Sequence, residues 1–269
     1  MKIFITGHRG FIGEHLMRRL VEQDAFDYCG FDLVCGGDIR DKVQLDIAID
    51  KFQPDVVIHL AALTGVRRGE DYAQEYFDTN VVGTENLMQL SKKHGVKKVI
   101  ILSSSSVNSG NPNSIYGASK LAMEHIVCRH NIGWQFIVRP FTVYGENGRK
   151  DEVLPRWVQQ YKSGKPITVY GNGNSFRTYV YVGDLIDALL MMCRYSPEEQ
   201  NITFELGGGK EVYLSKVLKI FLTKYPDAKV ENLPFPACDS LGREPDSTEV
   251  ERMGWKPKTD YETKVLEII

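Results

Sequence analysis

The sequence predicts an α/β fold in which helices cover both faces of a parallel β-sheet. Three observations support this prediction: short apolar runs alternate with helical segments up to about residue 145, the connections between them are short, and a glycine-rich turn lies in the first strand–helix unit. Such an alternation usually forms a parallel sheet with right-handed crossovers. At 269 residues, the chain is long enough for one large domain with a smaller lobe.

The first unit is the stretch 2–13, where an apolar run predicts a buried strand. Gly7, Gly10 and Gly13 follow at G-x-x-G-x-x-G spacing, and an amphipathic run over 11–21 predicts a helix. Glycines here allow a pyrophosphate to approach the backbone, where a Cβ would block it. The N-terminus of the helix then offers free N–H groups and a positive dipole. The alternative is a tight strand-to-helix turn that binds no ligand.

A second apolar run over 26–31 ends at Asp32, about 20 residues beyond the last glycine, where the ribose of a bound dinucleotide lies. A carboxylate at this position accepts hydrogen bonds from the ribose hydroxyls and repels a 2′-phosphate. We therefore expect NAD rather than NADP as the cofactor, and we expect Asp38 to accept from the adenine amine. The alternative for Asp32 is a surface carboxylate that closes a strand.

The later alternation predicts further strands at 55–60, 98–102 and 134–138, and helices at 71–94 (interrupted near Asn80) and 114–130. Beyond Gly145 the alternation stops and the chain becomes richer in Pro and Gly. The predicted fold class is thus α/β, a Rossmann-type doubly wound parallel sheet over residues 1–145. A smaller substrate-binding lobe over 146–269 is expected to be interleaved with late Rossmann elements near 184–195.

Composition excludes several classes of function. The net charge of −2 and the absence of a Lys/Arg-rich run argue against a nucleic-acid partner. No apolar segment is long enough to span a membrane, and the strand predicted from residue 2 leaves no room for a signal peptide. The cysteines are scattered without a C-x-x-C pair, which predicts reduced thiols in a cytoplasmic protein and no metal site. They are Cys29, Cys35, Cys128, Cys193 and Cys238.

The candidate catalytic residues are Tyr116 and Lys120, which share one helix face at i, i+4. A nearby ammonium is expected to lower the tyrosine pKa from about 10. Such a tyrosine can take the proton of a sugar hydroxyl while hydride leaves the same carbon. The serine run 103–106 lies at the carboxyl end of a strand, where ligands bind, and a serine there is expected to hydrogen-bond the reacting oxygen. The alternatives are a chance Tyr–Lys pair and a polar loop.

In order and spacing, the motifs resemble those of extended short-chain dehydrogenase/reductases of the NAD-dependent epimerase/dehydratase family. They are Thr6-Gly7-x-x-Gly10-Phe11-Ile12-Gly13, Asp38-Ile39, His59-Leu60-Ala61-Ala62, Asn80-x-x-Gly83-Thr84, the serine run, Tyr116-x-x-x-Lys120 and Arg139-Pro140-Phe141-Thr142-Val143-Tyr144-Gly145. The resemblance implies Ser104 as the catalytic hydroxyl, with Ser105 as its competitor. The implied cofactor contacts are Gly7, Arg9, Gly10, Phe11, Ile12, Gly13, Asp32, Asp38, Ile39, Leu60, Ala61, Ala62, Asn80, Tyr116, Lys120 and Pro140.

Segments 153–155, 167–171 and 176–184 resemble the nucleotide-sugar half of this family. There, a residue like Tyr170 packs on the base and an arginine like Arg177 pairs with the diphosphate, for which guanidinium geometry is well suited. The alternatives are an ordinary strand tyrosine and a surface charge. Further substrate contacts are expected from Ser104, Val153, Arg243 and Thr142, of which Thr142 stands where asparagine is common.

The reaction expected from the resemblance is 4-epimerisation of a UDP-hexose through a 4-keto intermediate. Related dehydratases place Asp-Glu directly after the catalytic serine, whereas this chain has Ser105 and Ser106. A glutamate typical of related decarboxylases is also missing, and Asp32 argues against an NADP-dependent 4-ketoreductase. The alternatives are such a ketoreductase or dehydratase, or a binding protein without turnover.

The resemblance also implies a homodimer formed by the helices at 71–94 and 114–130. Besides Thr142, two further departures from the family pattern lie outside these helices. The loop after the serines carries Asn108 and Ser109, and the tail beyond Arg243 is short.

Overall fold

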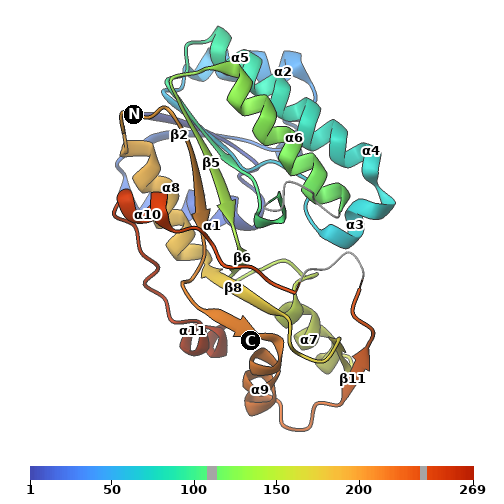
Figure 1. Cartoon of the computed structure of the whole chain (residues 1–269). Helices are drawn as coiled ribbons and strands as arrows, with labels where there is room; N and C mark the ends of the chain where they lie inside the picture. The colour runs from blue at the N-terminus through green and yellow to red at the C-terminus, as the bar shows by residue number, and fades with distance from the viewer. Residues whose placement is uncertain (108–113, 237–240) are drawn as a thin grey trace.

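The computed structural model describes residues 1–107, 114–236 and 241–269 (Figure 1). A six-stranded sheet has the order β2-β1-β3-β4-β5-β9, and all its strands are parallel. The strands are β1 (Lys2–Thr6), β2 (Asp27–Phe31), β3 (Val56–His59), β4 (Lys98–Leu102), β5 (Trp134–Pro140) and β9 (Asn201–Leu206). The strand order reverses between β1 and β3, which is where such sheets bind ligands.

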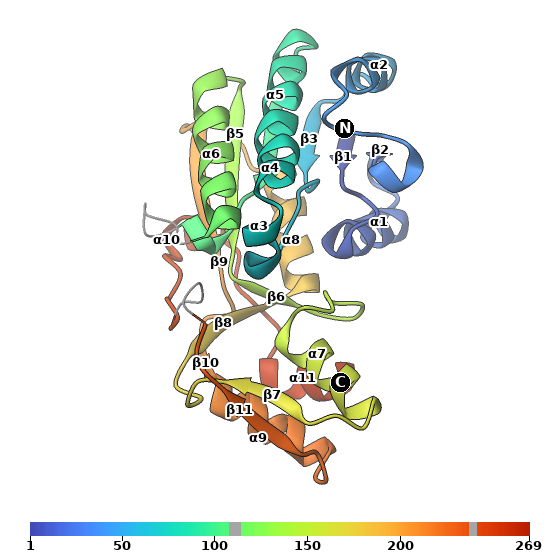
Figure 2. The same cartoon turned by 90° about the vertical axis from the view of Figure 1, so that its right-hand side faces the viewer.

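Helices cover both faces of this sheet, as predicted (Figures 1 and 2). Successive side chains of β1 point to opposite faces, so Ile3 and Ile5 pack in one core cluster and Phe4 in another. The first face is covered by α1 (Phe11–Gln23), α8 (Val182–Arg194) and α10 (Thr248–Arg252). The second is covered by α2 (Lys42–Phe52), α5 (Gly83–Lys93) and α6 (Ile115–His130). The fold is therefore the predicted doubly wound α/β sheet.

A second lobe lies beyond the carboxyl ends of the sheet (Figure 2). Two small sheets, β10-β8-β6 and β11-β7, pack with three helices around buried Trp157 and Phe221. These elements are β6 (Thr142–Tyr144), α7 (Val153–Lys162), β7 (Ile167–Tyr170), β8 (Phe176–Tyr181), β10 (Glu211–Tyr213), α9 (Leu214–Lys224), β11 (Val230–Leu233) and α11 (Tyr261–Ile268). The chain returns from this lobe to the main sheet, because β9 is one of its strands and α8 packs on one of its faces.

The predicted helix over 71–94 is divided into α4 (Ala73–Tyr76), the π-helical segment η2 (Phe77–Val82) and α5. A further short helix, α3 (Val66–Asp71), ends where the predicted helix begins. The expected interruption near Asn80 is thus a π-helical turn, a form often found at functional sites. Two single turns of 3₁₀ helix, η1 (Leu33–Cys35) and η3 (Ser105–Val107), follow β2 and β4.

Three further sequence expectations concern the described residues. None of their helices has the length and apolar character that crossing a bilayer requires. No group of three or more His, Cys, Asp or Glu side chains among them is arranged to hold a metal ion. Four of the cysteines are free thiols, whereas Cys238, like Asn108 and Ser109, lies outside the described residues.

A buried lysine joins the sheet to the end of α8. Lys98 on β4 is 3% exposed, and its Nζ donates to the backbone carbonyls of Met192 (2.9 Å), Cys193 (2.9 Å) and Tyr195 (2.6 Å). These carbonyls belong to the last turn of α8, where no backbone N–H is available for them. A cation also stabilises the negative end of the helix dipole there. Lys98 therefore acts as a C-cap supplied from another element.

We expect Lys98→Met to lower the free energy of unfolding by about 3 kcal/mol, because two buried carbonyls and one part-buried carbonyl lose their donor. Urea unfolding followed by circular dichroism measures the change. Lys97→Met is the matched control, since the Lys97 side chain is 72% exposed and pairs with Asp55 at 2.8 Å; a surface pair of this kind contributes less than about 1 kcal/mol. Equal losses in the two variants would contradict the capping interpretation.

Candidate active site

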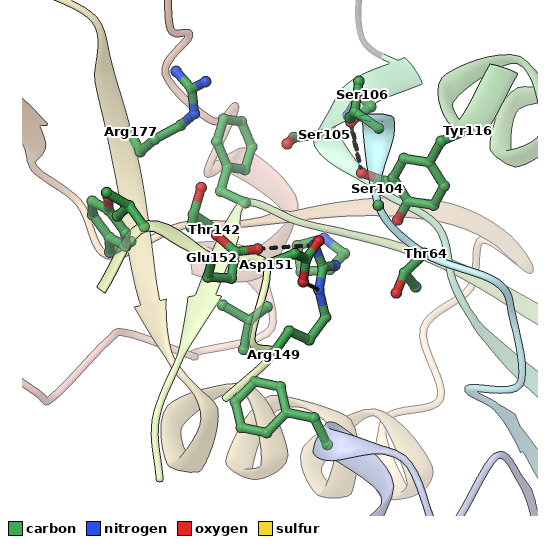
Figure 3. A pocket seen from close by; sticks show the side chains of 18 of the residues that line it. Thr64, Ser104, Ser105, Ser106, Tyr116, Thr142, Arg149, Asp151, Glu152 and Arg177 are labelled. Carbon is green, nitrogen blue, oxygen red and sulfur yellow. Dashed lines mark hydrogen bonds and ion pairs between the residues drawn. The ribbon is translucent and has the colours of Figure 1, made fainter. Parts of the chain in front are cut away.

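A cleft of about 1110 Å³ lies between the main sheet and the second lobe, at the carboxyl ends of the strands (Figure 3). It brings together residues predicted for the cofactor, the chemistry and the substrate from segments far apart in the sequence. The predicted residues that line it are Gly7, Gly10, Phe11, Ile12, Gly13, Leu60, Ala62, Ser104, Tyr116, Lys120, Pro140, Thr142, Val153, Tyr170, Arg177 and Arg243.

The glycine-rich turn has the geometry that a dinucleotide requires. Gly7 has φ +74°, and a Cβ there would lie 2.5 Å from the Ala61 backbone nitrogen; a Cβ on Gly13 would lie 2.3 Å from the Gly7 carbonyl oxygen. Gly10 is less enclosed and forms the uncapped N-terminus of α1, with no side-chain hydrogen bond to the first-turn amides. Those amides are free to receive an anion, so the turn fits the pyrophosphate of NAD.

Asp32 lies outside the main cleft, in a smaller hollow of about 310 Å³ at the end of β2. Its Oδ2 accepts from the Arg9 backbone N–H at 2.9 Å, and its Oδ1 accepts from the Val34 N–H at 3.0 Å. Each carboxylate oxygen keeps a second lone pair. Asp32 is therefore held against the glycine-rich turn with acceptor capacity left for ribose hydroxyls.

Two adjacent residues predicted to contact adenine are engaged elsewhere. The carboxylate of Asp38 receives Nε and Nη2 of Arg40 at 2.6–3.0 Å, and this pairing lowers the pKa of Asp38. Ile39 is 5% exposed and packs under Gly83, where an added Cβ would meet its Cδ1 at 2.5 Å. Neither residue lines the cleft, and their contact with the cofactor remains a prediction.

Ala61 and Asn80 also lie outside the cleft lining. Both belong to a buried polar network that positions the loop after β3. His59 bridges Thr6 (2.6 Å) and Thr84 (3.0 Å), and Thr6 Oγ1 accepts from the Ala61 N–H at 3.3 Å. Because Thr84 Oγ1 donates to the Asn80 carbonyl, it accepts from His59 Nε2. Burial lowers the pKa of His59 to about 3, so the imidazole is neutral. The network fixes the loop after β3.

Asn80 supports the same loop from the π-helical turn. Its Oδ1 accepts from the Leu63 N–H at 2.7 Å, while its Nδ2 donates to the Leu63 carbonyl (3.1 Å) and to Ser119 Oγ (2.9 Å). Ser119 lies between Tyr116 and Lys120 on α6. Asn80 therefore links the loop after β3 to the helix that carries the candidate catalytic residues.

Tyr116, Lys120 and Ser104 meet where β4 ends and α6 begins. The Ser104 side chain is close enough to the Tyr116 phenol to lower its pKa, and Ser104 Oγ lies 3.1 Å from Ser106 Oγ. Lys120 Nζ donates to the Leu102 carbonyl at 2.7 Å. Of the two serines left open by the sequence, Ser104 is the one that affects the pKa of the Tyr116 phenol, and the assignment of Ser104 as the catalytic hydroxyl stays a prediction.

The expected lowering of the tyrosine pKa is wrong for this structure. Burial raises the pKa of Tyr116, and Ser104 and Arg149 oppose that rise. Burial also lowers the pKa of Lys120 to about 7. Both shifts have the same cause, since a cleft that excludes water disfavours any charged form.

The NAD dependent epimerase/dehydratase family matches residues 3–207 of the chain. The chain belongs to this family. A probable UDP-glucuronate 4-epimerase of Rhizobium meliloti (strain 1021) is 30% identical over 243 residues, which are 75% of this chain and 70% of that protein. A UDP-N-acetyl-alpha-D-glucosaminuronate decarboxylase of Bacillus cytotoxicus is 29% identical, with 100% of this chain and 96% of that protein covered.

The crystal structure of UDP-glucuronic acid 4-epimerase from Bacillus cereus, in complex with UDP-glucuronic acid and NAD, is similar to this fold with a TM-score of 0.89. The likeness covers 100% of this chain and 97% of that one at 26% identity. Family membership and the fitting glycine-rich turn together make this protein an NAD-dependent enzyme of the epimerase/dehydratase family.

A charged cluster that is not among the sequence-based predictions lies on the second-lobe side of the cleft. Arg149 pairs with Asp151 (2.9 Å) and Glu152 (3.1 Å), and Figure 3 shows all three side chains in the cleft opposite Ser104 and Tyr116. The signal was the charged run 149–152, which follows the Arg139–Gly145 motif of this family and precedes α7. This cluster lies on the side of the cleft away from the serine run.

The end of the cleft around Tyr170 and Arg177 is rich in arginine. The Cζ atoms of Arg67 and Arg156 lie 4.3 Å and 5.1 Å from the centroid of the Tyr170 ring. Arg67 belongs to α3, so this contact connects the main sheet domain with the second lobe. Arg177 lines the same end, where its Nη1 donates to the Phe176 carbonyl at 2.7 Å. This is a cationic, aromatic surface suited to a nucleoside diphosphate.

Proposed function

We propose that the protein is an NAD-dependent 4-epimerase of a UDP-activated hexose or hexuronic acid. One observation carries the proposal: Ser104, Tyr116 and Lys120 line the same cleft as the glycine-rich turn and the arginine-rich nucleotide end. A nucleotide sugar bound across this cleft would place its diphosphate near Arg177 and its sugar near Tyr116. The epimerases among the related proteins support the same reaction.

The proposed chemistry is balanced within one cycle. NAD, when bound, accepts a hydride and returns it. Tyr116 takes the proton of the C4 hydroxyl as the C4–H bond breaks, and Ser104 hydrogen-bonds the oxygen that becomes the C4 carbonyl. Lys120, as an ammonium, stabilises the tyrosinate. The 4-keto sugar then turns over within the cleft. When hydride returns to its other face, Tyr116 gives the proton back, and the C4 epimer forms with no net oxidation.

A second candidate is dehydration of the same class of substrate, supported by Asp151 and Glu152. Eliminating water needs an acid near the leaving hydroxyl, and the positions after Ser104 supply none. These two carboxylates enter from the other side of the cleft instead, and burial raises the pKa of Glu152. A carboxyl that holds its proton more firmly is better placed to act as an acid.

Proton NMR of the purified protein with UDP-glucose, UDP-N-acetylglucosamine and UDP-glucuronate, without added cofactor, tests both candidates. We expect one tube to develop the anomeric signal of the C4 epimer. A new methyl doublet would instead indicate 4,6-dehydration, and loss of C6 from the uronate would indicate decarboxylation. No change in any tube would contradict the proposal and favour a ketoreductase or a binding protein. A homodimer and a cytoplasmic location stay predictions.

A further inference from the structure

One face of α6 contacts three consecutive residues at the end of β4. Tyr116, Lys120 and Glu124 are spaced at i, i+4 and i+8, so they lie one above the other. Tyr116 lies beside the Ser104 side chain, Lys120 Nζ donates to the Leu102 carbonyl, and Glu124 Oε1 accepts from Ser103 Oγ. The proposed chemistry uses the first two helix residues but gives no role to the third.

Glu124 is buried and rigidly held. Its side chain is 6% exposed, and the Arg139 guanidinium binds both its oxygens, with Nε to Oε1 at 2.9 Å and Nη2 to Oε2 at 2.6 Å. A paired fork of this kind is among the strongest interactions a carboxylate makes. Because Arg139 comes from β5, the carboxylate keeps its place relative to the sheet as well as to the helix.

The network continues beyond Arg139 to the nucleotide end of the cleft. Arg139 Nη1 lies 3.4 Å from Glu205 Oε1 on β9, and Glu205 Oε2 binds the Arg243 guanidinium and the Asp246 N–H. Glu205 is thus a second buried carboxylate on the same arginine, but on the side away from α6. This symmetry provides a matched control for Glu124.

We propose that Glu124 is a positioning residue for the catalytic group: its fixed carboxylate is the counter-charge of the buried Lys120 ammonium and holds Ser103 so that Ser104 meets Tyr116. The effect on turnover rests on the proposed function, whereas the effect on the charge of Lys120 does not. A carboxylate that served only to join β5 and β9 would leave Lys120 unaffected.

Among the described residues, the charged and titratable groups around the pair are few. Lys120 has Tyr116 and Glu124 on its own helix and neutral His59 from β3. Arg139 lies behind Glu124 on β5, and the Cys128 thiol, one turn further along α6, interacts with both Glu124 and Arg139. On the far side of Tyr116 are Arg149, Asp151 and Glu152, as described above. Burial lowers the pKa of Lys120, and Glu124 opposes this. Removing the Glu124 charge must therefore favour the neutral amine.

The test is an NMR titration of the full chain carrying isotope-labelled lysine, as isolated with its cofactor. The Lys120 signal is assigned by its absence in Lys120→Met. We expect Glu124→Gln to lower the Lys120 midpoint by about one pH unit, the effect of removing a nearby opposite charge. We expect Glu205→Gln, which removes the other carboxylate from Arg139, to leave the midpoint much less changed.

A Glu124→Gln midpoint that moves no further than that of Glu205→Gln would overturn the proposal. The turnover profile gives a second readout. If the ammonium is the working form, the alkaline limb of kcat/KM moves to lower pH in Glu124→Gln alone, whereas a purely structural loss lowers the whole profile without moving it. If Glu124→Gln lowers the Lys120 midpoint but the protein has no turnover, the proposed function fails and this inference stands.

Glu124→Asp keeps the proposal testable if the glutamine variant does not fold. Aspartate preserves the charge but withdraws it by one methylene from Ser103 and Arg139. We expect the Lys120 midpoint to stay near that of the unmodified protein while kcat falls severalfold at unchanged KM. An unchanged kcat in a folded Glu124→Asp protein would overturn the proposal.

Discussion

Replacing Tyr116 with Phe is expected to lower kcat for the nucleotide-sugar conversion by about a thousandfold, within the range that one acid–base group contributes. The phenol oxygen is the proposed proton acceptor from the C4 hydroxyl, and Ser104 lies close enough to it to lower its pKa. The ring itself stays in place, because Tyr76 packs edge-on against it with the centroids 6.3 Å apart. NAD should therefore remain bound, which absorbance of the extracted cofactor checks alongside NMR turnover.

Tyr170→Phe is the control for this variant. It removes a phenol oxygen from the same cleft but keeps the ring that Arg67 and Arg156 contact. We expect kcat to be nearly unchanged. If Tyr116→Phe retained more than about a tenth of the original kcat, Tyr116 would not be the acid–base group, and the binding-protein alternative would gain weight.

Gly7→Ala is expected to destabilise the protein by about 3 kcal/mol or more and to abolish NAD retention. The strain has two sources. The left-handed backbone at φ +74° disfavours any Cβ, and the added carbon would lie 2.5–2.8 Å from backbone atoms of Leu60 and Ala61. Since those atoms belong to the loop after β3, relief of the clash would push apart the two strand ends that frame the cofactor site.

Gly36→Ala isolates the backbone contribution. Gly36 has φ +85°, and an added Cβ meets no atom within 4 Å, so only the conformational cost of about 1 kcal/mol applies. Thermal unfolding with and without added NAD measures both variants, because a ligand raises the melting temperature only of a protein that binds it. A Gly7→Ala protein that melts like Gly36→Ala and still responds to NAD would contradict the assignment of this turn.

The sequence by itself determined those features that depend on neighbours along the chain. The apolar runs form the parallel strands, and the spaced glycines form the tight turn between β1 and α1. The i, i+4 spacing placed Tyr116 and Lys120 on one helix face, and the break expected near Asn80 became the π-helical turn. All of these follow from local rules: alternation in strands, periodicity in helices, and backbone conformations that only glycine adopts easily.

Only the tertiary structure decided which distant groups meet and how much water they retain. Glu124, Arg139 and Glu205 form one network from three elements, and Arg149 and Glu152 face Tyr116 from the second lobe. Burial raises the pKa of Tyr116, although the sequence predicts a lowered pKa, and the reason is the same. A neighbouring cation can be inferred from spacing, but the desolvation that opposes it arises only when the lobes enclose the cleft.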